Sequence, residues 1–320
     1  MKALFATPLG WRVMAPMLRP GGITVLMYHS VDNGETVFDS VHVDRFRKQM
    51  EWLKANCAVI DPNDFEDALE SKPKQRPMVV LTFDDGYRDY HDMAYPILRG
   101  LGLPALVFLT TGFIDGGGII WTETISWAVR STRLTSATLP WDPTERFALD
   151  PPAARREFER RCKYYLKGIP DDASTHWRQV LMDELKVEPG ALAAQRRMLS
   201  WDEVRAAKAL TRYGGHTHNH PILSQTTPQR ASHEIALCRD RIADETGIAP
   251  THFAYPNGRV QDFNETTKDL LRQHGFKLGY SSIGGVHRPG MDKFAIRRQP
   301  TGAARLGDFA WLVAGGTDHD

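Results

Sequence analysis

Residues 78–86 read MVVLTFDDG, a continuously apolar run that ends in two adjacent aspartates and a glycine. Such a run is typical of a strand that is buried on both faces of a parallel sheet. Asp84 and Asp85 then lie at the C-terminal end of the strand, where successive side chains point to opposite sides. Gly86 allows a sharp turn that can bring both carboxylates to one opening. A plain strand end with an Asx-type turn is the alternative interpretation.

Strand-like and helical segments alternate along most of the chain. Apolar runs predict strands at 23–28, 78–83, 104–109, 212–218, 252–256, 277–282 and 293–298. Helical patterns lie between them at 43–56, at 62–70, after Thr227 and at 264–274. Repeated strand and helix units predict an α/β fold with a parallel sheet, either a barrel or an open doubly wound sheet. Seven candidate strands favour a barrel, whose functional residues gather at the C-terminal strand ends.

One segment, residues 121–197, interrupts this alternation. A proline-rich stretch at 140–152 precedes a charged helical run, ARREFERRCKYYLKG, at 154–168. We expect a mainly helical insertion that lies over the barrel. The basic and aromatic side chains of this run can touch an anionic substrate, but a solvated helix face is the favoured interpretation. The predicted organisation is an N-terminal extension at 1–21 and a barrel domain at 22–320 that carries the insertion.

The composition excludes several classes of protein. With 320 residues, 42% hydrophobic and 25% charged, the chain is typical of a soluble globular protein, and a net charge of +1 gives no sign of nucleic-acid binding. Three widely spaced cysteines predict reduced, buried thiols of a cytoplasmic protein. The N-terminal stretch lacks the apolar core of a signal peptide, and no window approaches the ~18 apolar residues of a membrane span. A short amphipathic helix at 10–18 is expected to pack on the domain, with weak peripheral contact at the inner membrane face as the alternative.

A second chemical cluster is GGHTHNHP at 214–221, which follows another strand-like run. His216 and His220 are four residues apart, so a helical turn would place both imidazoles on one side. A carboxylate from another strand end would complete a set of two histidines and one aspartate, which is typical of a catalytic divalent metal site. If one of the two adjacent aspartates binds the metal, its neighbour lies beside the bound water and can act as a general base.

Three motifs in this order, TFDDG at 82–86, HTHNHP at 216–221 and FAYPNG at 253–258, resemble the NodB-homology polysaccharide deacetylases of carbohydrate esterase family four. The flanking stretches VLMYHSV, LPALVFLTTGFI and LSWDEVRAAKA agree with the resemblance, which covers about residues 22–300. It implies a distorted (β/α)7-type barrel. It also implies metal-dependent hydrolysis of an N-acetyl group on an amino sugar.

The resemblance assigns a role to each matching residue. Asp84 is the catalytic base, and the backbone N–H of Asn257 helps to hold the oxyanion. The implied metal ligands are Asp85, His216 and His220, and the usual ion is zinc, with cobalt or nickel in some members.

Two positions depart from the family pattern. The third motif often carries an arginine that orients the base, and Ala254 stands there in this chain. Either Arg297 or Arg298 can substitute, and since only one of two adjacent strand residues faces the pocket, we favour Arg297. The usual late acid histidine corresponds to His287, in a glycine-rich stretch that we expect to be a mobile loop.

His29 is the favoured general acid because it lies at the end of the first predicted strand, where a rigid mount fixes its ring. A subgroup that resembles the biofilm poly-N-acetylglucosamine deacetylases carries its acid histidine in such an early motif. A partly buried structural histidine is the alternative interpretation of His29.

Three functions follow from these patterns. The first is deacetylation of an amino sugar in a polysaccharide, an oligosaccharide or a lipid-linked glycan, and the missing export signal makes a lipid-linked or intracellular sugar plausible. The second is hydrolysis of another amide, such as an N-formyl sugar or a small cyclic amide. The third is a catalytically inactive glycan-binding homologue, which the complete ligand set disfavours because buried ligands are costly to leave unpaired.

Overall fold

A computed structural model describes residues 10, 21–34, 40–71, 76–188, 197–302 and 305–316. The predicted N-terminal extension at 1–21 and the amphipathic helix at 10–18 fall almost entirely outside these ranges. Within the described ranges, no helix combines the length and the apolar character that crossing a membrane requires.

The centre of the fold is a sheet of eight strands, all paired in parallel, in the order β11-β10-β9-β6-β5-β1-β12, with β4 beside β5. The strands are β1 (Ile23–Tyr28), β4 (Ala58–Val59), β5 (Met78–Phe83), β6 (Ala105–Leu109), β9 (Thr211–Gly215), β10 (His252–Ala254), β11 (Leu278–Tyr280) and β12 (Gln299–Pro300). The register pairs Tyr28 with Phe83, so β1 and β5 end at the same level. Their next residues, His29 and Asp84, therefore begin the same rim.

The sheet curls toward closure through the last part of the chain. Ile296 forms a parallel bridge with Tyr280 of β11, and β12 then pairs with β1 at the other end of the sheet. This confirms the predicted barrel-like α/β fold. The strand expected at 293–298 is wrong, because the Ala295 N–H bonds to the Asp292 carbonyl in a turn, and the extended backbone touches the sheet at Ile296 and again in β12.

The apolar run of β5 is buried on two sides, which explains its composition. Val79 and Leu81 belong to the outer core together with Phe46 and Leu53 of α3. Met78 and Val80 fill the barrel interior with side chains from β1, β6, β10 and β11. The surrounding elements include β2 (Ser30–Asp32), β3 (Ser40–His42), α3 (Val43–Asn56), η1 (Pro62–Asp64), α4 (Phe65–Glu70), η2 (Tyr90–Ala94), α5 (Tyr95–Leu101), α6 (Thr111–Gly116), α11 (Trp201–Ala207), η3 (Leu223–Gln225), α12 (Pro228–Thr246), α13 (Glu265–Gln273) and α14 (Leu306–Val313).

The expected helices are confirmed nearly to the residue, and their caps explain where two of them begin. The Thr227 side chain accepts a hydrogen bond from the Arg230 N–H at the start of α12. Asn264 caps α13 in the same way through the Thr267 N–H. Such side-chain acceptors satisfy N–H groups that lack a partner in the first turn of a helix.

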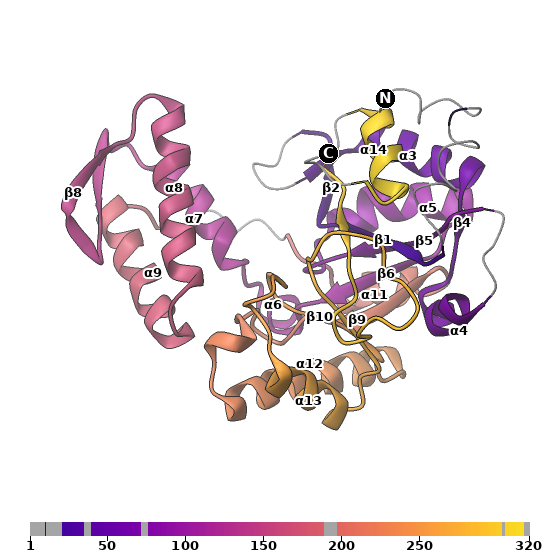
Figure 1. Cartoon of the computed structure of the whole chain (residues 1–320). Coiled ribbons are helices and arrows are strands. Elements are labelled where there is room, and N and C mark those ends of the chain that lie inside the picture. Colours follow the sequence, from indigo (N-terminus) through magenta and orange to yellow (C-terminus); the bar gives the residue numbers. More distant parts are fainter. Residues whose placement is uncertain are drawn as a thin grey trace.

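The insertion forms a separate lobe beside the barrel, at the left of Figure 1. It contains α7 (Trp121–Ser131), the antiparallel hairpin of β7 (Ser136–Leu139) and β8 (Asp142–Ala148), α8 (Pro152–Lys167) and α9 (Asp171–Leu185). Its own core joins Ile125, Phe158 and Leu181, one from each helix. The mainly helical character is confirmed, but the hairpin was missed because β8 is a mostly exposed strand without apolar alternation.

Candidate active site

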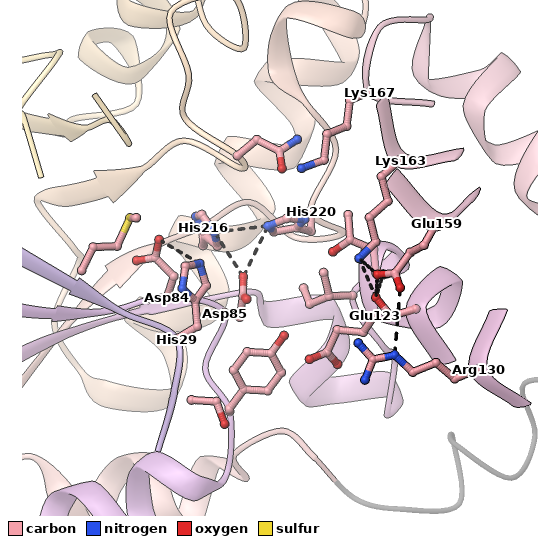
Figure 2. Close-up of a pocket in the computed structure, with 17 residues that line it drawn as sticks. His29, Asp84, Asp85, Glu123, Arg130, Glu159, Lys163, Lys167, His216 and His220 are labelled. Atoms are coloured by element: carbon pink, nitrogen blue, oxygen red, sulfur yellow. Dashed lines mark hydrogen bonds and ion pairs between the residues drawn. The ribbon is translucent and has the colours of Figure 1, made fainter. Parts of the chain in front are cut away.

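A cavity of about 430 Å³ lies between the barrel rim and the insertion. Figure 2 shows the side chains that line it. The barrel wall supplies His29, Asp84, Asp85, His216, His220 and Asn257, and the insertion wall supplies Glu123, Ser126, Arg130, Glu159, Lys163 and Lys167. The three expected metal ligands, the expected base and the favoured acid thus meet in one cavity.

The turn after β5 brings both aspartates to this cavity. Asp85 and Gly86 both adopt left-handed backbone conformations, with φ of 72° and 83°. The Gly86 N–H donates to the Asp84 carbonyl at 2.9 Å, so the chain reverses within three residues. A Cβ at Gly86 would lie 3.1 Å from Leu109 Cδ2, tighter than ordinary packing. The unusual φ of Asp85 itself, and not glycine alone, is what aims the second carboxylate.

Asp85, His216 and His220 form a compact, buried ligand set. Asp85 Oδ1 lies 3.3 Å from His216 Nε2 and 3.4 Å from His220 Nε2. The two Nε2 atoms are 3.2 Å apart. Ligands about 2.0–2.1 Å from a tetrahedral zinc ion are separated by roughly 3.3 Å, so these three side chains fit such an ion. Burial opposes ionisation of Asp85, but hydrogen bonds from both histidines hold its pKa well below the usual value.

Backbone contacts fix both histidines. His216 Nδ1 lies 2.7 Å from the carbonyl oxygen of Ala254, which places its hydrogen on Nδ1 and leaves the Nε2 lone pair free for a metal. The His220 N–H donates to Thr217 Oγ1 at 2.9 Å. Thr217 and His220 have φ of 65° and 57°, so a loop with left-handed residues, and not the expected helical turn, brings the rings together.

Arg298, and not the favoured Arg297, pairs with Asp84. Its Nη1 and Nη2 donate to the two carboxylate oxygens of Asp84 at 2.6 and 2.9 Å, and its Nε donates to the Ser281 carbonyl at 2.7 Å. Side chains alternate along the extended segment, so Ile296 and Arg298 point inward while Arg297 turns out to the Gly284 carbonyl. Burial opposes ionisation of Asp84, but the charge of Arg298 and the nearby His216 and His29 lower its pKa.

The two candidate acids lie at opposite ends of the barrel. His29 Nε2 is 3.9 Å from Asp84 Oδ2, and its side chain is 31% exposed on the cavity. His287 is fully buried and exchanges backbone hydrogen bonds with Ile23, at the start of β1. The expected loop at His287 is instead paired with the start of β1 and packed against the Phe65 ring. Burial lowers the pKa of His287 to about 4.

Asn257 lies beyond β10 and also lines the cavity. Its φ of 60° is left-handed, and its side-chain Nδ2 is buried without a hydrogen-bond partner among the described residues. The site therefore holds a side-chain amide donor at this position, in addition to the backbone N–H that the sequence predicts as an oxyanion ligand.

The insertion wall holds polar residues that have no role in the sequence analysis, except that contact between the basic side chains of the run at 154–168 and an anionic substrate is its less favoured interpretation. Ser126 Oγ donates to Glu159 Oε1 at 2.6 Å, and Lys163 Nζ donates to the same oxygen at 2.6 Å. Burial raises the pKa of Glu123 to about 7, although the charge of Arg197, 3.7 Å away, opposes this. The spacing of four between Glu159, Lys163 and Lys167 was the available signal, since it places all three on one helix face.

The exposed residues of α8 agree with the expected solvated face. Arg156, Arg160 and Tyr164 are exposed, whereas Lys163 and Lys167 line the cavity. The helix is thus solvated on one side and forms part of the site on the other.

Comparison with known proteins places these features in one family. The polysaccharide deacetylase family model matches residues 71–178 and 187–279. The Bacillus subtilis protein YxkH is 34% identical over 94 residues, which are 28% of this chain and 33% of YxkH. The poly-β-1,6-N-acetyl-D-glucosamine N-deacetylase of Escherichia coli K12 is 32% identical over 100 residues, 29% of this chain and 15% of that protein. The matched segments thus span a third or less of these relatives.

Solved structures share the fold over most of the chain. The deacetylase PplD of Streptococcus pyogenes has a TM-score of 0.62 at 18% identity and covers 92% of this chain and 99% of its own. IcaB from Ammonifex degensii has a TM-score of 0.60 at 20% identity and covers 93% and 99%. The family model matches more than half of this chain. This chain therefore belongs to the polysaccharide deacetylase family, whose members are hydrolases of amide C–N bonds.

Proposed function

We propose that this protein removes the N-acetyl group from an acetylated amino sugar, with N-acetylglucosamine as the first candidate. The observation that carries the proposal is the meeting of Asp84, Asp85, His216, His220 and His29 in one buried rim cavity. Support for the sugar comes from the Escherichia coli relative, which is named for a β-1,6-linked N-acetylglucosamine polymer.

Asp85, His216 and His220 would hold a divalent ion, which would supply Lewis acidity for the amide and lower the pKa of water. The two histidines and one carboxylate are ligands that zinc prefers, and cobalt or nickel suits the same set.

The remaining steps fall to side chains of the barrel wall. Asp84, kept ionised by Arg298, accepts a proton from the attacking water. Asn257 donates a hydrogen bond to the oxyanion of the tetrahedral intermediate. His29, whose Nε2 lies 3.9 Å from Asp84 Oδ2 and whose ring is open to the cavity, donates a proton to the departing amine.

A catalytically inactive glycan-binding protein fits the site less well. Such a protein has no need for two buried histidines aimed at a buried carboxylate, since unpaired burial of these groups is costly. Hydrolysis of an N-formyl sugar remains within reach of the same residues, and a substrate panel separates it from deacetylation.

The test is a release assay with the full chain, stripped of metal and then supplied with zinc, cobalt or nickel. Substrates are N-acetylglucosamine oligomers, lipid-linked N-acetylglucosamine and the matching N-formyl sugar, and acetate or formate is measured. We expect acetate release that depends on added metal. Formate release without acetate release would overturn the assignment.

A further inference from the structure

The face of α8 that lines the cavity carries Glu159, Lys163 and Lys167, each four residues after the one before. Residues with this spacing are neighbours on a helix surface. α7 adds Ser126 and Arg130 to the same wall. Glu123 of α7 also lines this wall and pairs with Arg197, so the wall carries three cations and two carboxylates and remains positively charged.

Glu159 is already shared by two of the cations. Lys163 Nζ donates to Glu159 Oε1 at 2.6 Å and to Ser126 Oγ at 2.5 Å. Arg130 Nε lies 4.0 Å from Glu159 Oε2. In the part of the chain that the structure describes, Lys167 forms no hydrogen bond or ion pair, while every other charged side chain of the cavity has one. Figure 2 shows the Lys167 amine extending from α8 into the cavity.

The surroundings of Lys167 favour a bound anion. Burial lowers the pKa of Lys167 to about 8, the charges of Arg259 and Lys163 act in the same direction, and Asp262 opposes them. Asp262 is itself engaged by Arg259, whose Nε lies 2.9 Å from Asp262 Oδ2. A partly desolvated ammonium group next to other cations gains most from an anion that enters the cavity.

We propose that Lys167 and Lys163 bind a phosphoryl group carried by the acetylated amino sugar. The lysine ammonium group is a compact point charge that binds phosphate well. The inference rests on the proposed function, because it assigns the substrate class of the same site. It makes the preferred substrate a phosphate-bearing sugar and not a neutral polymer.

The cavity is large enough for this arrangement. Its volume of about 430 Å³ lies within the ~300–1,000 Å³ of small-molecule sites. Because both walls line this one cavity, the proposal places the acetamido group at the barrel wall and the phosphate at the insertion wall.

The experiment measures binding by calorimetry with the full chain and two probes, N-acetylglucosamine 1-phosphate and neutral tri-N-acetylchitotriose. We expect Lys167→Gln to weaken binding of the phosphorylated sugar roughly tenfold or more, as loss of a charged hydrogen bond does, and to leave the neutral probe unchanged. Arg156→Gln is the matched control, because Arg156 is an exposed cation of the same helix outside the cavity. It should change neither affinity.

A second variant has the opposite expected sign. Glu159→Gln removes the carboxylate that engages Lys163, so it should strengthen binding of the phosphorylated sugar several-fold and make it more sensitive to salt. Weaker binding in Glu159→Gln would contradict a phosphate site built on Lys163.

Other outcomes overturn the proposal directly. Equal losses for both probes in Lys167→Gln would show a structural role. Selective loss for a glucuronate-containing N-acetylglucosamine disaccharide, without loss for the phosphate, would assign the cations to a carboxylate.

Acetate release separates the two proposals, since Lys167-dependent phosphate binding without any turnover supports the phosphate site and rejects the deacetylase. Equal turnover of phosphorylated and neutral sugars supports the deacetylase and rejects the phosphate site.

Discussion

The two walls of the cavity are held in place by different kinds of contact. On the barrel wall, functional side chains stand on strand ends and tight turns that are fixed by backbone bonds, such as the Asp84 N–H to the Tyr28 carbonyl at 2.9 Å and His216 to Ala254. On the insertion wall, Lys163, Glu159 and Ser126 bond to one another through their side chains, and one further bond joins Ser126 Oγ to the Thr122 carbonyl of the same helix. The barrel wall is therefore suited to chemistry, which requires fixed geometry, and the insertion wall to recognition. Substitutions in the first should lower kcat, and those in the second should change KM.

The largest effect should come from Asp84→Asn. This variant keeps all three expected metal ligands but cannot accept a proton from water, so kcat should fall by about 10⁴, the upper range for a general base. The measurements are acetate release and metal content by mass spectrometry. Asp85→Asn is the matched variant, because it should lose metal and activity together. If Asp84→Asn lost metal while Asp85→Asn retained it, the two roles would be reversed.

His29→Ala should lower kcat by on the order of 10²–10³, somewhat less than Asp84→Asn, because solvent that reaches the exposed side of this ring can partly replace the proton donor. Metal content should not change. His287→Ala is the control at the far end of the barrel, where loss of a fully buried ring should lower the melting temperature and leave turnover of the folded protein intact. Turnover that survives His29→Ala and collapses in His287→Ala would reverse the assignment.

Arg298→Gln should cost about tenfold to a hundredfold in kcat with little change in KM, because Asp84 loses the bidentate partner that positions it. The variant should also be less stable by roughly 3–5 kcal/mol, as expected when one member of a buried ion pair is removed. Arg298→Lys should restore part of kcat. The neighbouring Arg297→Gln should alter neither quantity, because Arg297 is bonded outward to the Gly284 carbonyl. Equal losses of kcat and stability in Arg298→Gln and Arg297→Gln would contradict the assignment of Arg298 alone as the partner of Asp84.

The residues of the barrel wall could be predicted from the sequence because apolar runs mark where the strands end. Asp84 follows the apolar run of β5, and His29 follows the apolar run of β1. The register pairs the last residues of the two strands, so both side chains begin at the same level. The choice between Arg297 and Arg298 failed because it depends on which face of an extended segment looks inward. The bridge between Ile296 and Tyr280 determines which alternate residues of this segment face the interior. Both residues of that bridge are far from Asp84 in sequence.

For the insertion wall, the sequence pattern favoured a solvated helix face over contact with an anionic substrate, for a different reason. The charged pattern of α8 fits a solvated helix equally well, since Arg156 and Arg160 are exposed while Lys163 and Lys167 are not. Which side of this helix meets the barrel is decided by the insertion core, where Phe158, Cys162 and Leu166 are buried. The orientation of the lobe on the rim follows from tertiary packing that no local pattern encodes.

The smallest effect that tests the comparison is expected from Ser126→Ala. Ser126 is buried, and its hydroxyl donates to Glu159 and accepts from Lys163, so its loss removes two hydrogen bonds to charged groups, while the direct contact between Lys163 and Glu159 remains. Because the remaining contact between Lys163 and Glu159 keeps both side chains in place, we expect a net loss of only about 0.5–1.5 kcal/mol, which corresponds to a rise in KM of roughly twofold to tenfold, and kcat should remain at the wild-type value. Ser174→Ala is the matched control, because Ser174 is a buried serine of α9 in the same lobe that does not line the cavity. It should leave KM unchanged. A fall in kcat for Ser126→Ala as large as that for Arg298→Gln would mean that the insertion wall takes part in the chemistry. The assignment of chemistry to the barrel wall and recognition to the insertion wall would then be wrong.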